Sequence, residues 1–423
     1  MDVTSKSRLR SLKIVNILVC CFVCWPFVWS LWSYLRVPTE LLGTHFAAIL
    51  IFFIAFGSWL SSPMKLKTPL NLWLLFYFVT LLESRNANMR VYINDLGISL
   101  SAWLVCATAA QRDYDSTRAV KCIRVTGMIA ALSVVLENTV HLFTGLLSPL
   151  YISKAFELTR GGGLGGGLFP YSSYAGCFIV PGLAALIIQE ENRTKNRRFY
   201  IETAVYLLSL VLIRKRGFIL DIVLGSLFLW YLDILGQGKI VIRGNKSTKR
   251  LISVVAFLML LFAVYHSVPF IREALDSFLA KFYEEDGDFS GRGSLYALAF
   301  SIFRGNMLTG IGWGQFRALS QGVFYYASTK TYEVHNVYLQ LLCENGIVGL
   351  LAFLLATGRL LLYSSRKYIM LIFKREAVAE RRKAVKLAVF LQVFFLTYCI
   401  SGNPLYDYNF AVTYFIGVLL AFA

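Results

Sequence analysis

The chain has 423 residues, of which 57% are hydrophobic and only 16% are charged. A soluble domain cannot bury so much apolar surface, so the composition excludes a soluble enzyme and predicts a protein embedded in a bilayer. The net charge of +18 would suit a nucleic-acid partner, but the basic residues lie in short tracts between apolar runs. That arrangement is typical of topology control in membrane proteins, so we expect no nucleic acid among the partners.

The apolar runs predict an all-α, polytopic integral membrane protein with about 12 transmembrane helices, at roughly 20 residues for each span. Residues 6–13 and the apolar run after them lack a small-residue cleavage site, so we interpret them as the start of a first span. We expect one transmembrane domain over residues 1–423. In chain order, the predicted spans are 14–35, 41–60, 68–84, 91–110, 125–147, 170–189, 199–213, 217–235, 251–268, 336–358, 385–402 and 409–423.

The basic residues also predict the orientation of the chain. Most of the 42 lysines and arginines fall in alternate connecting segments, which places these segments and both termini in the cytoplasm. The longest outer connection is then the extracytoplasmic loop 269–335, in which residues 294–303 have the pattern of a short helix on the membrane surface. A shorter outer loop, 148–169, contains a glycine run that begins after Arg160. Because this run lacks the Gly-Lys-Ser/Thr ending of a nucleotide loop, we interpret it as an anion-binding nest of N–H groups beside Arg160 or as a hinge.

The stretch HNVYLQLLCENGIVGL at 335–350 opens a predicted span at its outer end. His335 is either a helix-capping residue or a general base that orients or deprotonates a sugar hydroxyl. A helix N-terminus also favours anions such as a pyrophosphate. Asn336, Gln340 and Glu344 are four apart and form one polar stripe. Glu344 faces about 180° away from His335 on a helix, so we expect it to pair structurally with a neighbouring helix.

Further cations are predicted on the outer face. Arg214, Lys215 and Arg216 lie together between two spans, where positive residues are unusual. They either snorkel to the interface or bind phosphate, for which the planar arginine side chain is suited. Arg292 has a glycine on each side and precedes the short helix. Trp313, within the Gly-rich turn 310–314, either stacks on a sugar ring or anchors the loop.

Other ionisable residues fall inside or beside the predicted spans. Glu137, His141 and Asp221 lie within apolar runs, where such groups are functional hypotheses by default. We expect them to be counter-ions of the arginines at 214 and 216. Asp407 is an outer-face acid without a predicted partner. The eight cysteines show no metal-ligand spacing and no disulfide pattern, so we expect small buried apolar residues, no metal and no cofactor.

These residues resemble a known family, the bacterial O-antigen ligases and polysaccharide polymerases. The family signature is His-Asn, two variable residues, Leu, and then an acid-x-Gly-x-x-Gly-Leu. The matching residues here are His335, Asn336, Leu339, Glu344, Gly346, Gly349 and Leu350. Arg292 with the run 310–316, and Arg216 with the glycine after it, resemble the arginine segments of the family. Lys215 stands where the family has serine, so Arg214 is the alternative equivalent of Arg216.

The resemblance implies a metal-independent glycosyltransferase on the outer face of the bacterial plasma membrane, with an undecaprenyl-pyrophosphate-linked glycan as donor. Arg216 and Arg292 would neutralise the leaving pyrophosphate, and His335 would orient or deprotonate the acceptor hydroxyl. Membrane lipid and a chain-length regulator would be further partners. Residues that would bind the pyrophosphate or glycan are Arg214, Arg160, Asn336 and Trp313.

Two activities of the family compete. The acid at Glu344 resembles polymerases more than ligases, so we expect a polymerase that builds O-antigen, capsule or exopolysaccharide. The alternative is an O-antigen ligase that transfers a finished glycan to a lipid or protein acceptor. A transporter is a rival from another class, but it should concentrate polar groups near the bilayer midplane, whereas here they gather at outer helix ends.

Overall fold

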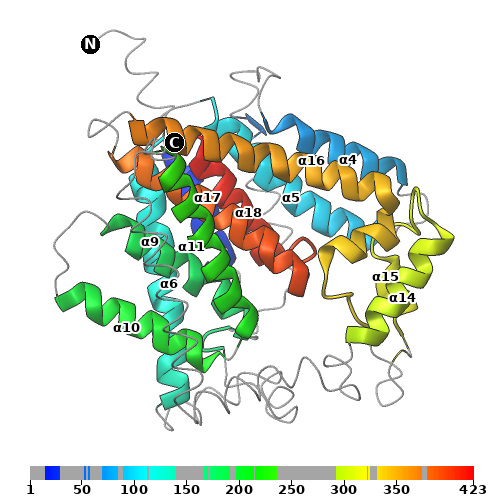
Figure 1. Ribbon diagram of the computed structural model, residues 1–423, viewed down its shortest axis with the longest axis horizontal. Coiled ribbons are helices and arrows are strands. Elements are labelled where there is room, and N and C mark those ends of the chain that lie inside the picture. The colour runs from blue at the N-terminus through cyan, green and yellow to red at the C-terminus, as the bar shows by residue number, and fades with distance from the viewer. Residues whose placement is uncertain are drawn as a thin grey trace, which may run out of the picture.

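The computed structural model describes residues 15–28, 52–53, 56–57, 69–83, 89–111, 114–139, 166–169, 172–190, 197–213, 215–236, 292–321, 323, 331–373 and 379–423. Within these ranges the regular structure is helical, apart from one isolated bridge between Gly166 and Phe169. Figure 1 shows the helices Val15–Val28, α4 (Asn71–Leu82), α5 (Met89–Ala109), α6 (Ser116–Thr139), α9 (Ser172–Gln189), α10 (Arg197–Leu212), α11 (Arg216–Gly236), α14 (Arg292–Gly305), α15 (Gln315–Leu319), α16 (Val337–Phe373), α17 (Ala379–Ser401) and α18 (Tyr408–Ala421).

Five of these helices, α6, α9, α11, α16 and α17, are long and apolar enough to cross a membrane. Shorter apolar helices accompany them at Val15–Val28, Asn71–Leu82, Gly97–Ala109 and Asn409–Ala421. The prediction of a helical membrane protein is therefore confirmed. The total of roughly 12 spans stays a prediction, because the predicted spans 41–60 and 251–268 lie largely or wholly outside the described residues.

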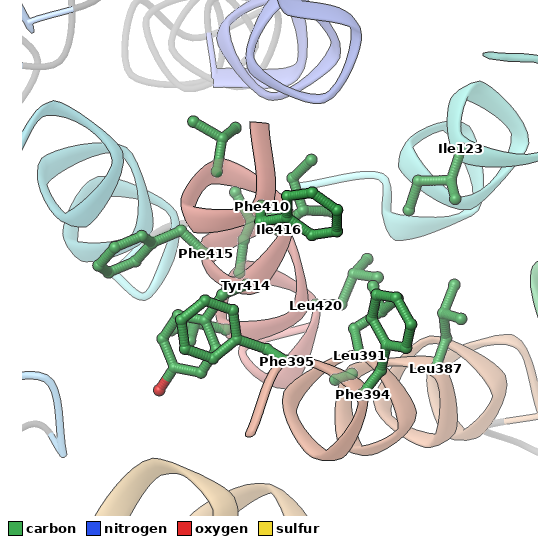
Figure 2. Close-up of a cluster of buried hydrophobic side chains, with 14 of the residues drawn as sticks. Ile123, Leu387, Leu391, Phe394, Phe395, Phe410, Tyr414, Phe415, Ile416 and Leu420 are labelled. Carbon is green, nitrogen blue, oxygen red and sulfur yellow. The ribbon is translucent and has the colours of Figure 1, made fainter. Parts of the chain in front are cut away.

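The centre of the protein is formed by α17 and α18, which pack against each other and are covered by other helices (Figure 1). Aromatic side chains fill the contact between them, as Figure 2 shows around Phe395 and Tyr414, whose ring centroids are 4.6 Å apart. Ile123 reaches the same cluster from α6. Offset and edge contacts of this kind stabilise a core beyond simple burial of area. The two helices that follow one another at the end of the chain thus form the scaffold for the rest.

The outer helices leave large apolar side chains exposed. Helix α11 exposes Ile219, Leu220 and Leu227, and α16 exposes Leu351 and Leu355. Exposed apolar side chains on helices long enough to span a membrane indicate contact with lipid, because hydrocarbon does not penalise them as water does. The exposed faces of α11 and α16 are therefore suited to contact with lipid.

Helix α16 is longer than the predicted span 336–358. It continues to Phe373 through the segment expected to be a cytoplasmic connection, and it is interrupted at Gly346, where φ is 64° and ψ is −167°. The predicted span ended at residue 358 because the apolar run stops there and a basic segment follows, but arginine and lysine are good helix formers. Lys367 also finds partners, since its Nζ donates to the carbonyl oxygens of Ala421 (2.9 Å) and Ala423 (2.8 Å). The basic residues therefore extend the helix instead of ending it.

A second, smaller core joins α14 and α15 to the first half of α16. It contains Leu295 and Ala299 of α14, Phe316 of α15, Val334 in the segment before α16, and Cys343 of α16. The short helix predicted at 294–303 is therefore present as α14 (Figure 1). Its place on a membrane surface stays a prediction.

Candidate active site

Three helix ends meet at Ser401, the last residue of α17. Arg292, the first residue of α14, donates from Nη1 to the Ser401 carbonyl oxygen at 3.2 Å. Gly217, in the first turn of α11, approaches the same residue so closely that a methyl group there would lie 3.1 Å from Ser401 Oγ. The starts of α11 and α14, which carry the two predicted arginines, are thus brought to one place. Helix N-termini present free N–H groups, which favour an anion there.

His335 lies beside these helix starts. Its φ is 60°, and among the described residues it is the one residue other than glycine with a positive φ. Burial, and then the positive charges of Arg292 and Lys215, lower the pKa of His335 from 6.5 to about 4. The imidazole is therefore neutral near neutral pH and has a lone pair available for a hydroxyl proton. The same two cations would attract a phosphate.

The residue after His335 fixes the start of α16. Asn336 Oδ1 accepts a hydrogen bond from the Leu339 backbone N–H at 3.0 Å, which is the contact of a helix N-cap. Asn336 was predicted to bind substrate, and the structure gives its oxygen a second, structural task. A cap at this position fixes the first turn of α16. It therefore also fixes the backbone of His335, the residue just before the cap, relative to the helix.

The interruption of α16 at Gly346 is filled by the turn that precedes α15. Ile347 N donates to Met307 O at 2.8 Å, while Ile311 N and Gly312 N donate to Cys343 O (3.0 Å) and Glu344 O (2.8 Å). Backbone groups freed by the break thus find partners in the turn, as burial requires. The glycines at 310, 312 and 314 all have positive φ, so the Gly-x-Gly-x-Gly spacing is needed to fold this turn against the helix.

Glu344 is fully buried and holds this turn in place. Its Oε1 accepts from the Phe316 backbone N–H at 3.2 Å, and its Oε2 accepts from the Tyr406 hydroxyl at 2.9 Å. The expected partner of Glu344 was a neighbouring helix, whereas these contacts are made by the short helix α15 and by the connection before α18; its structural role stays a prediction.

Trp313 is only 1% exposed, and its ring stacks on Tyr406 with centroids 4.5 Å apart. Of the two interpretations of Trp313, this packing favours loop anchoring, because a sugar has no open ring face to meet.

Of the remaining candidate residues, some lie outside the described ranges and others have contacts in the structure. Arg160 and Arg214 lie outside the described residues. Arg216 is the first residue of α11, and only its backbone is described. Glu137 accepts a hydrogen bond from the Gly167 backbone N–H, so it anchors the end of the glycine run. Its pairing with the arginines stays a prediction. Asp221 is 1% exposed and lies within hydrogen-bonding reach of Thr397 on α17.

Asp407 has a partner that the sequence did not reveal. Its Oδ1 accepts from the Asn409 N–H at 3.0 Å and so caps α18. Burial raises the pKa of Asp407 to about 7. The residues missed from sequence are in the same connection: Ser401, which receives Arg292, and Asn403, whose buried amide has no hydrogen-bond partner among the described residues. The available signal was the Ser-Gly-Asn-Pro run between two apolar segments, which marks a turn at a helix end.

No cluster of three or more histidine, cysteine, aspartate or glutamate residues with metal-binding geometry is found in the described parts of the chain. Residues 174–354 match the family model described as O-Antigen ligase. This match makes residues 174–354 similar to the O-antigen ligase family. The predicted resemblance to the O-antigen ligases and polysaccharide polymerases is confirmed, and the matched region contains Arg216, Arg292 and His335. A comparison with curated proteins finds no match.

The O-antigen ligase family implies an enzyme of the glycosyl-transfer type that acts on lipid-linked glycans. Together with the apolar helices, it indicates a protein of the bacterial inner membrane. The match covers the arginine and histidine segments and the first part of α16, and it ends before α17 and α18. Ser401, which accepts the hydrogen bond of Arg292, therefore lies beyond the matched region.

Proposed function

We propose that this protein is a polymerase that joins undecaprenyl-pyrophosphate-linked oligosaccharide repeat units into a polysaccharide on the outer face of the plasma membrane. The observation that carries the proposal is that Arg292, which is held by the Ser401 carbonyl oxygen, and Lys215 both lie close enough to His335 to keep its imidazole neutral. Cations and helix N-termini suit the pyrophosphate of a lipid-linked donor, and a neutral imidazole beside them suits a sugar hydroxyl.

The reaction would proceed by direct displacement. The acceptor hydroxyl attacks the anomeric carbon of the donor sugar, the bond from that carbon to the pyrophosphate oxygen breaks, and undecaprenyl pyrophosphate leaves. The proton of the hydroxyl passes to a ring nitrogen of His335. Arg292, with Arg216, stabilises the negative charge that develops on the leaving group, a contribution that is often the largest in catalysis. The pyrophosphate also offsets the cations that lower the pKa of His335, so donor binding makes the imidazole a better base.

The arrangement of the charged groups supports one reactive face. Two cations predicted to be cytoplasmic, Arg124 and Lys386, pair with acids near the cytoplasmic ends of predicted spans: Arg124 with Glu202 at 2.6 Å and Lys386 with Asp233 at 3.2 Å. Residues predicted to be extracytoplasmic, such as Arg292 and His335, meet in a separate place. This separation supports a multi-pass topology with the site on the outer side and both termini inside.

The test is a glycan gel from a strain that lacks this gene, restored with wild type, His335→Ala, Arg292→Ala or Arg304→Ala. Arg304 is the matched control, because it is at the other end of α14 and lies over the Phe300 ring at 4.6 Å. We expect the deletion to leave single repeat units on their final acceptor, and only wild type and Arg304→Ala to restore long chains. A ladder restored by His335→Ala at normal protein level would overturn the proposal.

The same gel separates the alternatives within the family and outside it. Long chains that stay on the lipid carrier in the deletion strain would identify a ligase, whose acceptor is a lipid or a protein. Loss of all outward-facing glycan, with repeat units retained inside the cell, would identify a transporter. A chain-length regulator is the partner that a polymerase would require, and its deletion should change chain length without abolishing the ladder.

A further inference from the structure

His335 is held in a backbone conformation that residues other than glycine rarely adopt. The φ of 60° places it in the left-handed region, which persists only where the surroundings fix the neighbouring residues. Such positions concentrate at functional sites, where the strained residue is aimed at a target. A neighbouring side chain must therefore fix the segment that leads into His335.

Gln340 is that side chain. It is fully buried, and its Oε1 accepts a hydrogen bond from the Val334 backbone N–H at 3.2 Å. Its Nε2 donates to Glu333 Oε2 and lies 3.5 Å from Glu344 Oε1. One amide thus bonds both residues that precede His335. From its place one turn inside α16, Gln340 ties the entering chain to the helix that follows.

The chemistry of these contacts requires an amide. An amide offers one acceptor oxygen and two N–H donors, which match one backbone N–H and two carboxylates. Glutamate of the same size would keep the acceptor and lose the donors, while leucine would lose both. Burial makes each lost partner expensive, because the groups left behind cannot turn to water.

The contacts continue from Gln340 to the arginine. Glu344 Oε2 accepts from the Tyr406 hydroxyl at 2.9 Å, and Tyr406 N donates to Asn403 O at 3.0 Å. Asn403 is two residues from Ser401, whose carbonyl oxygen receives Arg292. Gln340 is therefore part of one connected set of contacts that reaches both the histidine and the arginine, from segments that are far apart in the chain.

We propose that Gln340 is a positioning residue that sets the direction of the His335 imidazole toward the acceptor hydroxyl and, through Glu344 and Tyr406, its placement relative to Arg292. The inference rests on the proposed glycosyl transfer and names a residue outside the His-Asn and Gly motifs that led to it. Gln340 touches no reacting atom in this scheme. Its effect is on turnover, because a displaced base loses alignment while the cations that hold the pyrophosphate stay in place.

The experiment measures initial rates of chain growth with the purified full-length protein in detergent. The donor probe is the lipid-linked repeat unit extracted from the deletion strain. The variants are Gln340→Leu, Gln340→Glu, His335→Ala and the double variant His335→Ala with Gln340→Leu. The matched control is Gln392→Leu, because Gln392 is equally buried and donates from Nε2 to Ser364 Oγ at 2.7 Å on another part of the fold. Melting of each variant is followed alongside.

We expect Gln340→Leu to lower kcat by about 100-fold, the size of effect that a displacement of about 1 Å produces, with KM for the donor changed by less than about threefold. Gln392→Leu should leave kcat close to that of wild type. Gln340→Glu keeps the bond to Val334 N and should lose about 10-fold, which gives a second measurement if Gln340→Leu does not fold. In the double variant, Gln340→Leu should add no further loss, because its effect passes through the missing histidine.

The outcomes that would overturn the proposal are distinct. Wild-type kcat in both Gln340→Leu and Gln340→Glu, with His335→Ala inactive, overturns the positioning role and leaves the proposed function intact. A further loss when Gln340→Leu is added to His335→Ala also overturns it, since the residue would then act independently of the imidazole. Full turnover by His335→Ala overturns the proposed function itself, and the inference with it.

Discussion

Replacing Gly346 with alanine perturbs the junction on which the candidate site is built. Gly346 interrupts α16 with φ 64° and ψ −167°, a combination that is essentially restricted to glycine. A methyl group at this position would lie 2.1 Å from the carbonyl oxygen of Leu308, well inside van der Waals contact. Either the helix must straighten or the turn 306–314 must move away.

The size of the effect follows from these contacts. Holding alanine in this backbone region costs about 1–3 kcal/mol. Moving the turn loses the bond from Ile347 N to Met307 O (2.8 Å) and the longer one from Val348 N to Leu308 O (3.4 Å), each about 0.5–1.5 kcal/mol. Together these give a loss of about 2–6 kcal/mol in the free energy of unfolding.

Gly358, on the same helix, provides the matched control. It has regular helical geometry, and a methyl group added there would have no atom within 4 Å, so Gly358→Ala should stabilise the protein by about 0.5–1 kcal/mol. The assay is thermal melting of the two purified variants in detergent, with glycan chain formation measured in parallel. We expect Gly346→Ala to melt below wild type and lose activity, and Gly358→Ala to melt at or above wild type. Equal melting temperatures and equal activities for the two variants would refute the account of the broken helix.

Three further predictions concern the site. If the neutral imidazole of His335 is the active form, kcat/KM should rise with pH through the lowered pKa near 4, and Lys215→Ala should move this limb to higher pH by removing a positive charge. Asn336→Ala should lower stability by about 1 kcal/mol in a melting experiment, whereas Asn336→Ser should retain most of it, because serine also caps a helix. Tyr406→Phe should lose about 1–3 kcal/mol, because the buried carboxylate of Glu344 is left without its hydroxyl donor.

Each of these predictions can fail separately. An acid limb that stays in place in Lys215→Ala would show that this lysine does not act on the imidazole. Equal stability of Asn336→Ala and Asn336→Ser would show that Asn336 does not stabilise the protein as a helix cap. The predicted substrate contact would then be its remaining role. A Tyr406→Phe variant as stable as wild type would mean that the carboxylate finds another donor.

The apolar pattern of the sequence was enough to predict a membrane environment and most of the helices. Apolar runs of membrane length predict helices because a chain in lipid must satisfy its own backbone hydrogen bonds, and this holds whatever the helices pack against. Most helix boundaries in the described ranges fall within a few residues of the predicted ones, α11 and α18 among them. The His-Asn motif with its glycines also pointed to the family that residues 174–354 match.

The way in which the candidate site is assembled could not be predicted from the sequence, because it depends on how distant helices pack. Arg292 and its partner Ser401 are 109 residues apart, and no periodicity in either segment encodes that contact. The break in α16 and the burial of Trp313 were likewise hidden, because glycine and tryptophan in a turn are compatible with both an open loop and a packed one. Hydrophobic pattern specifies which face of a helix is buried, but the partner on that face is set by how the helices pack together. For that reason the left-handed His335, and Gln340 that holds the chain before it, could be recognised only in the folded protein.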